Sequence, residues 1–235
     1  VQALPTGGAI VAVTTSAHPW VDGAVTITPT TAGTVTMLMY FDDNGQSQRA
    51  LDVGTNQVGA RGLAYDCVSQ LLFVAVWQNG AYDYGGSVGA RAATPGVTTW
   101  SPAIVGYAVA ADGTVTATTY AAMTLAGPST FTAPPIAVSR SGGGAWVCAS
   151  VTGATTPVVA ADMADQGMAD LLVVGVDASG AVTHNARYGS AGDDLVEACA
   201  DGGADGVWVG LSFASTGTTE AVIVRGAALS STAAV

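Results

Sequence analysis

Lysine is absent from this chain, and cationic side chains are few. Six arginines stand against 17 acidic residues, which gives a formal net charge of −11 at pH 7. Without lysine the chain cannot build a P-loop phosphate site, a pyridoxal-phosphate Schiff base or the catalytic lysine of a kinase. Without a basic stripe we expect no nucleic-acid partner, and an anionic membrane surface repels such a protein. The composition therefore excludes large classes of intracellular chemistry.

Long apolar runs are also missing. Apolar runs such as 71–77 and 171–176 fall well short of the ~18–20 residues that a membrane-spanning helix needs. Disorder is equally excluded, because 49% of the residues are hydrophobic and only 10% are charged. A length of 235 residues suits one large all-β domain or two small ones. The sequence begins at Val1 without a basic or apolar leader, so we expect a processed mature form or an excised domain, extracellular or at the cell surface.

Only three cysteines occur, Cys67, Cys148 and Cys199. They are too few and too widely spaced for a disulfide scaffold or a CxxC metal site. At most one disulfide can form, and its pairing stays open. Each cysteine lies in an apolar, strand-like run, so we expect three small buried side chains.

Small residues and β-formers are abundant, and they are arranged in repeats. The turn glycines Gly45, Gly113 and Gly180 follow similar apolar runs and lie 68 and 67 residues apart. Similar intervals between matched turns indicate a repeat protein. We predict a single repeat domain over 1–235, with repeats at about 1–57, 58–124, 125–190 and 191–235.

Each repeat holds four short segments rich in Val, Thr, Ile and aromatic residues, separated by glycine-containing turns that are typical of hairpins. Many segments are apolar at consecutive positions, which indicates burial on both faces. Antiparallel sheets stacked on one another bury strands in this way. The predicted fold is therefore all-β, a β-propeller-like array of about four four-stranded antiparallel blades. A stacked open array and a fragment of a larger ring remain alternatives.

One stretch resembles a known repeat family. The residues that carry the likeness form a Gly-Ser-x-Gly-Asp-Asp turn and a later Val-Trp-Val-Gly strand: Tyr188, Gly189, Ser190, Gly192, Asp193, Asp194, Val207, Trp208, Val209 and Gly210. This arrangement resembles the SBBP-type β-propeller repeat, best over 186–215, and 134–153 resembles the same unit without the Asp-Asp turn. The resemblance implies a propeller fold and says little about function.

Candidate catalytic residues do not form a convincing set. Gly85-Gly86-Ser87-Val88-Gly89 fits the G-x-S-x-G pattern, but polar residues precede it where a nucleophile elbow needs a buried strand. His18 and His184 lie in different repeats, and neither has an acid in a matching position. We therefore predict no catalytic site, no cofactor and no resident metal.

Weaker candidates lie at turns and in long loops. Carboxylates at turns could supply oxygen ligands to Ca²⁺, although turns also select Asp for its hydrogen bonds to the backbone. The calcium candidates are Asp42, Asp43, Asp193 and Asp194. Aromatic side chains in polar, glycine-rich loops could stack on sugars, and these ligand-loop candidates are Trp20, Tyr82, Tyr84 and Trp100.

Threonine and proline occur together in several loops, and the chain has no N-x-Ser/Thr sequon. O-linked glycosylation is a hypothesis for a secreted protein of this composition. The candidates are Thr28, Thr30, Thr31, Thr94, Thr132 and Thr156. The alternative is that threonine serves β-propensity and proline ends strands.

Together these features favour a non-catalytic structural or interaction protein, secreted or at the cell surface. In its most specific form it is a self-assembling, O-glycosylated subunit of an extracellular fibre or matrix, with itself, other extracellular proteins or glycans as partners. The alternative is a glycan-binding or glycan-cleaving propeller that uses loop aromatics and carboxylates, among them Asp193, Asp194 and Glu197.

Overall fold

The structure, a computed structural model, describes residues 1–5, 7–15, 20–22, 25–27, 35–54, 58–92, 101–122, 130–131, 135–152, 169–189, 192–203, 206–213 and 219–225. Within these ranges the regular structure consists of β-strands, and every strand pair is antiparallel. No helix in this part of the chain is long and apolar enough to cross a membrane.

The strands form four large sheets, each drawn from one stretch of the chain. The first sheet contains β1 (Gln2–Ala3), β2 (Ala9–Thr15), β5 (Val35–Phe41) and β6 (Ser47–Gly54). The second contains β7 (Val58–Asp66), β8 (Leu71–Gln78), β11 (Ser101–Val109) and β12 (Val115–Ala122). The third contains β14 (Ile136–Ser139), β15 (Ala145–Thr152), β16 (Ala169–Val176) and β17 (Val182–Tyr188), and β13 (Thr130–Phe131) also pairs with β15. The fourth contains β18 (Asp194–Asp201), β19 (Gly206–Phe213) and β20 (Thr219–Arg225).

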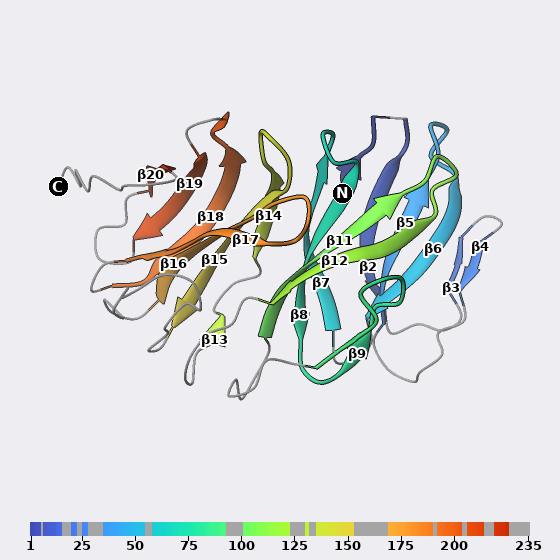
Figure 1. Cartoon of the computed structure of the whole chain (residues 1–235), viewed down its shortest axis with the longest axis horizontal. Coiled ribbons are helices and arrows are strands. Elements are labelled where there is room, and N and C mark those ends of the chain that lie inside the picture. The colour runs from blue at the N-terminus through green and yellow to red at the C-terminus, as the bar shows by residue number, and fades with distance from the viewer. Residues whose placement is uncertain are drawn as a thin grey trace.

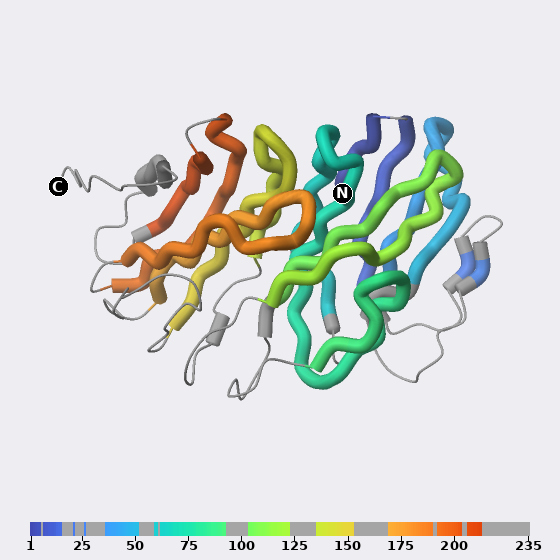
Figure 2. Tube along the Cα trace, in the orientation of Figure 1, coloured from blue at the N-terminus to red at the C-terminus, as the bar shows by residue number. Residues whose placement is uncertain are grey.

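Two short hairpins stand apart from these sheets. One joins β3 (Trp20–Asp22) to β4 (Val25–Ile27), and the other joins β9 (Tyr82–Asp83) to β10 (Ala90–Arg91). Figure 1 shows the large sheets in a row, with the first and the fourth at opposite ends and the β3–β4 hairpin beside β6. Figure 2 shows the segment that carries β9 and β10 as an arm leaving the end of β8 and returning along the second sheet.

The prediction of an all-β fold with antiparallel sheets of four strands is confirmed in this coarse form, and three strands of the fourth sheet are described. Edge strands of successive sheets are neighbours, because β14 contacts both β7 and β18. Closure of the row into a propeller stays a prediction.

The repeated turns have one backbone geometry, which explains the spacing of their glycines. In each, the residue three positions before the glycine accepts a hydrogen bond from the glycine N–H: Gly45 to Asp42, Gly113 to Ala110, Gly180 to Asp177. The glycines have φ between 74° and 82°, a left-handed conformation that costs glycine nothing. The sequence period therefore records a conformational requirement.

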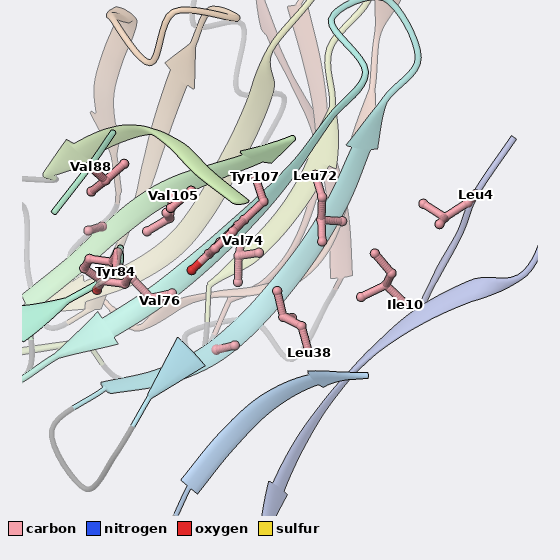
Figure 3. Packing of buried hydrophobic residues seen from close by; sticks show 13 residues of the cluster. Leu4, Ile10, Leu38, Leu72, Val74, Val76, Tyr84, Val88, Val105 and Tyr107 are labelled. Carbon is pink, nitrogen blue, oxygen red and sulfur yellow. The ribbon is translucent and has the colours of Figure 1, made fainter. Parts of the chain in front are cut away.

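Apolar side chains fill the three layers between successive sheets. Figure 3 shows the layer between the first and second sheets, where Ile10 and Leu38 face Leu72, Val74 and Val76. The intervening residues of the same strand β8, including Phe73 and Ala75, belong to the next layer, against the third sheet. Successive side chains of a strand point to opposite faces of its sheet, and both faces of the second sheet are buried. Apolar residues therefore occupy consecutive positions in the strand. Each large side chain buried in this way contributes about 1.5–3 kcal/mol.

A disulfide between Cys148 and Cys199 joins β15 of the third sheet to β18 of the fourth. Its Cα atoms lie 6.5 Å apart and its ends are 51 residues apart in the chain. Cys67 is a free, exposed thiol. Of the three cysteines expected to be buried, Cys148 is buried and Cys199 is only partly buried. The expectation was wrong for Cys67, because β7 ends at Asp66 and Cys67 is the first residue of the following turn.

Candidate functional site

The part of the arm that carries β9 and β10 holds two of the four aromatic ligand-loop candidates, Tyr82 and Tyr84, and a buried glutamine anchors it. The Gln78 amide nitrogen donates to the carbonyl oxygens of Gly80 and Arg91, both at 2.7 Å. Its carbonyl oxygen accepts from the hydroxyls of Tyr84, at 3.2 Å, and Tyr120, at 3.1 Å. Because Gln78 is buried and makes all four bonds, it holds both ends of the arm onto the second sheet.

The tyrosine rings of this arm pack on one another. Tyr82 meets Tyr84 edge-on with ring centroids 4.8 Å apart, and Tyr84 lies 5.6 Å from Tyr120. The Arg91 guanidinium stands 5.2 Å from the centroid of the Tyr120 ring. Burial raises the pKa of Tyr84 well above its ordinary value. The structure thus brings Tyr82 and Tyr84 together and engages their rings in internal contacts; Trp100 and the side chain of Trp20 lie outside the described residues.

The G-x-S-x-G segment is a docked loop. The Ser87 amide donates to the carbonyl of Ala117 at 3.1 Å, and its hydroxyl donates to the carbonyl of Thr118 at 3.0 Å. A Cβ on Gly86 would lie 2.1 Å from the Ala117 carbonyl oxygen, so glycine is required for this close approach. This geometry agrees with the loop interpretation of Ser87 and provides no strand–turn–helix around it.

The calcium candidates form two separate pairs, and each pair has a fold-related role. In the first pair, Asp42 caps its turn: one carboxylate oxygen accepts from the amides of Asn44 and Gln46, both at 2.9 Å. The hydrogen bond from the Gln46 amide is the main reason that the pKa of Asp42 lies below its ordinary value. Asp43 is exposed in the same turn. Among the described His, Cys, Asp and Glu side chains, no three gather as a group that could hold a metal ion.

The second pair, Asp193 and Asp194, lies where the chain passes from the third sheet to the fourth. Asp193 accepts a hydrogen bond from the amide of Ala169 at 3.1 Å, and Asp194 is fully buried. Nearby, a Cβ on Gly189 would lie 1.8 Å from a carboxylate oxygen of Asp170. The described residues of the Gly-Ser-x-Gly-Asp-Asp motif, Gly189, Asp193 and Asp194, therefore lie at the junction between the two sheets.

A buried ion pair lies beside Gly189. Arg187 Nε donates to Asp170 Oδ2 at 2.7 Å, and its terminal nitrogen lies 2.5 Å from the same oxygen. The side chains of Arg187 and Asp170 are 1% and 0% exposed. A charge pair removed from water to this degree must be retained as a pair, because losing either partner leaves an uncompensated buried charge. Nothing in the sequence marks Arg187 and Asp170 as a pair, because they are 17 residues apart and share no motif.

Two further carboxylates join neighbouring sheets, a role that the sequence did not indicate for either. Buried Asp66, at the β7–β8 turn, accepts from the amide of Gly144 in the β14–β15 turn at 2.8 Å. Asp201, at the end of β18, accepts from the amide of Ser141 at 3.2 Å and from its hydroxyl. The β14–β15 turn is therefore held from both sides. The Asp-x-x-Ser spacing of Asp66 and Ser69 signals a local turn, but nothing in it points to a partner 78 residues away.

His184 lies against Trp146 on the third sheet. The two rings meet edge-on with centroids 5.5 Å apart, and the Arg140 guanidinium stands 4.9 Å from the Trp146 centroid. Burial, and secondly the charge of Arg140, lower the pKa of His184, so the imidazole is neutral at pH 7. His184 is thus a packed side chain of the sheet, and His18 lies outside the described residues.

A groove of about 250 Å³ opens between the first sheet and the β11–β12 turn of the second. Its floor is apolar, with Ile10, Leu38 and Leu51, and Tyr40 and Arg49 also line it. Arg49 pairs with Asp112 at 2.8 Å, and both side chains are about half exposed. An exposed pair of this kind contributes little to stability, because water and salt screen the two charges. The groove holds no set of convergent polar groups that would define a chemistry.

The six O-glycosylation candidates, Thr28, Thr30, Thr31, Thr94, Thr132 and Thr156, all lie outside the described residues. Compared with known proteins, the chain matches no family model. No curated protein matches its sequence. The resemblance to the SBBP-type repeat therefore stays a prediction that rests on the residues quoted for it.

Proposed function

We propose that the protein is a non-catalytic structural or interaction module of the extracellular space or cell surface, built as a propeller-type array of sheets. The single observation that carries this proposal is the use to which the polar side chains are put. Hydrogen bonds within the fold engage four polar side chains and hold sheets and loops together: Asp66, Asp170, Asp201 and Gln78. Catalysis and ligand binding need such groups aimed into a cleft.

The disulfide supports the extracellular part of the proposal. Disulfides persist in oxidising compartments and are rare in reducing ones. The Cys148–Cys199 bond crosses the layer between the third and fourth sheets, where its reduction would uncouple two sheets. O-linked glycans on the threonine-rich loops belong to the same proposal, because they suit a secreted, repeat-built surface protein.

Self-association is the interaction that the repeats support best. Successive sheets bury apolar faces against one another, so the uncovered face of a sheet at the end of the row can pack against another sheet in the same way. Other extracellular proteins and glycans are the remaining partner classes.

The test is a pair of measurements on full-length protein from its native source. Intact-mass spectrometry should show mass in excess of 23.1 kDa from glycans, and a glycan array with a hydrolysis assay on the same sample should show neither tight binding nor turnover. Turnover that disappears in Asp193→Asn or Glu197→Gln protein that still folds would overturn the proposal in favour of the glycan-cleaving alternative.

A further inference from the structure

Trp208 stands on the outer face of the fourth sheet and is 45% exposed. Along β19 the side chains alternate: Val207, Val209 and Leu211 pack against the third sheet, and the residues between them point the other way. Four large apolar side chains are exposed in the part of the chain that the structure describes, namely Val1, Val21, Val68 and Trp208. Of these four, Trp208 alone lies in one of the four large sheets.

Residues at the position equivalent to Trp208 in other sheets are buried. The turns before β2, β15 and β19 share one hydrogen bond, from the amides of Leu4, Arg140 and Gly202 to the carbonyls of Gly8, Gly144 and Gly206. Two residues after each of these glycines come Ile10, Trp146 and Trp208, so the three side chains occupy equivalent positions. Ile10 is 1% exposed beneath the second sheet, and Trp146 is 3% exposed beneath the fourth. The Trp208 position is therefore one that a following sheet covers elsewhere in the molecule.

The surroundings of Trp208 suit a sheet as the covering partner. Ala200 stands opposite Trp208 in the register, and Ala198 stands opposite Gly210, which gives a flat strip of small residues beside one raised indole. At the edge of this strip the Ser212 hydroxyl donates to Glu197 Oε1 at 2.8 Å, so that carboxylate already has a partner. We call Trp208, Ala198, Ala200 and Gly210 the Trp208 face.

The opposite end of the row is different. On the outer face of the first sheet, Met37 and Met39 are fully buried, and Val13 and Phe41 are half-buried beside them. Figure 1 places the β3–β4 hairpin beside β6 at this end. A head-to-tail fibre needs a complementary open face at each end of the subunit, whereas one open face can pair with its own counterpart about a two-fold axis.

We propose that the Trp208 face docks on the Trp208 face of a second copy of this chain, with the indole of each copy against the Ala198–Gly210 strip of the other. The proposal rests on the proposed function as an interaction protein and narrows its self-association to a closed two-fold dimer in place of a fibre. The dimer adds one layer at the open end of the row, and this layer pairs two identical faces, whereas each layer within the chain pairs unlike faces of successive sheets. Three strands of about eight residues cover roughly 26 Å by 14 Å, or about 360 Å² per copy. This is less than the roughly 800 Å² per partner of a standard interface, so we expect a weak dimer with an affinity in the upper micromolar range.

Sedimentation equilibrium of the full, oxidised chain between about 1 and 200 μM, in 150 mM salt, tests the proposal. The wild-type protein should show a monomer–dimer equilibrium with a dimer of twice 23.1 kDa. Trp208→Glu should weaken dimerisation at least ten-fold. Gly210→Gln should do the same, because a Cβ at Gly210 has its nearest neighbour at 3.4 Å and so fits within one copy. Val68→Glu, at an exposed apolar residue in the β7–β8 turn, is the matched control and should dimerise like the wild type.

A monomer at every concentration, a dimer that survives both substitutions in folded protein, or an ordered filament would each overturn the proposal. Far-ultraviolet circular dichroism of each variant shows whether the sheets are intact. Failure of the proposed function is a separate result: glycan turnover would overturn the non-catalytic role and leave a Trp208-dependent dimer standing.

Discussion

The carboxylate of Asp66 accepts a hydrogen bond from the backbone amide of Gly144 at 2.8 Å, and this bond links two successive sheets. The same side chain accepts from the amides of Val68 and Ser69 and from the Ser69 hydroxyl. One buried carboxylate thus closes its own turn and fixes the next sheet.

Replacing Asp66 with asparagine should destabilise the fold by about 3 kcal/mol. The amide group has one acceptor oxygen, so its NH₂ faces donors that have lost their acceptor, and each hydrogen bond to a buried charge is worth about 1.5–3 kcal/mol. Urea unfolding measured by tryptophan fluorescence checks the loss. Asp43→Asn, at an exposed carboxylate, is the control and should change stability by no more than about 0.5 kcal/mol. Equal effects of the two substitutions would contradict the inter-sheet role of Asp66.

The same carboxylate should make stability depend on acid pH. Burial tends to raise the pKa of Asp66, but the hydrogen bonds from Ser69, Gly144 and Val68 outweigh it and hold the pKa below its ordinary value of 3.8. A carboxyl group with a depressed folded pKa contributes stability above its unfolded pKa and loses that contribution as the pH falls through the folded pKa. The difference in unfolding free energy between wild type and Asp66→Asn should therefore be constant from pH 7 to about pH 5 and shrink below pH 4. A difference that does not change down to pH 2 would show that the charge of Asp66 plays no part.

The buried pair of Arg187 and Asp170 gives a test with an internal control. Arg187→Met or Asp170→Leu alone should cost about 3–5 kcal/mol, since each removes one charge of the pair and leaves the other buried without it. The double variant Arg187→Met/Asp170→Leu should cost less than the sum of the two single changes, because two apolar side chains need no partner. Thermal unfolding of the three variants measures this coupling. Additive losses would mean that the two side chains act independently.

The turns and strands could be predicted from the sequence because their signals are local. Gly45, Gly113 and Gly180 mark a left-handed position in each repeated turn, and consecutive apolar residues such as Leu72 and Phe73 mark strands buried on both faces. The groups that join the sheets could not be predicted in this way. Asp66 and Gly144 are 78 residues apart, and Ser141 and Asp201 are 60 apart, so their pairing depends on how the sheets are stacked.

The composition of the loop around Tyr84 does not indicate how its aromatic rings are placed. Its glycines and polar residues suggested aromatic rings open to a ligand, yet Gln78 satisfies the Tyr84 hydroxyl from inside the second sheet. A glutamine at the end of a strand gives no sequence signal of this role, because its four hydrogen-bond partners lie at four different distances along the chain.

The Cys148–Cys199 disulfide should be a main source of stability for the fourth sheet. In the chain-entropy account, a bond that closes a loop of 51 residues is worth about 4 kcal/mol. Cys148→Ala/Cys199→Ala should lower the unfolding free energy by about 2–5 kcal/mol, and reducing agent should have no further effect on that variant.

Cys67 supplies the control for this prediction, because it is exposed and free. Cys67→Ser should leave the unfolding free energy within about 0.5 kcal/mol of the wild-type value. This control measures the effect of replacing a cysteine that forms no disulfide. In denatured protein that has not been reduced, a thiol-reactive chromophore should label one site in the wild type and none in Cys67→Ser, because unfolding exposes every free thiol. If denatured Cys67→Ser protein were labelled at two sites instead, Cys148 and Cys199 would be reduced thiols, and the extracellular assignment would lose the support that the disulfide gives it.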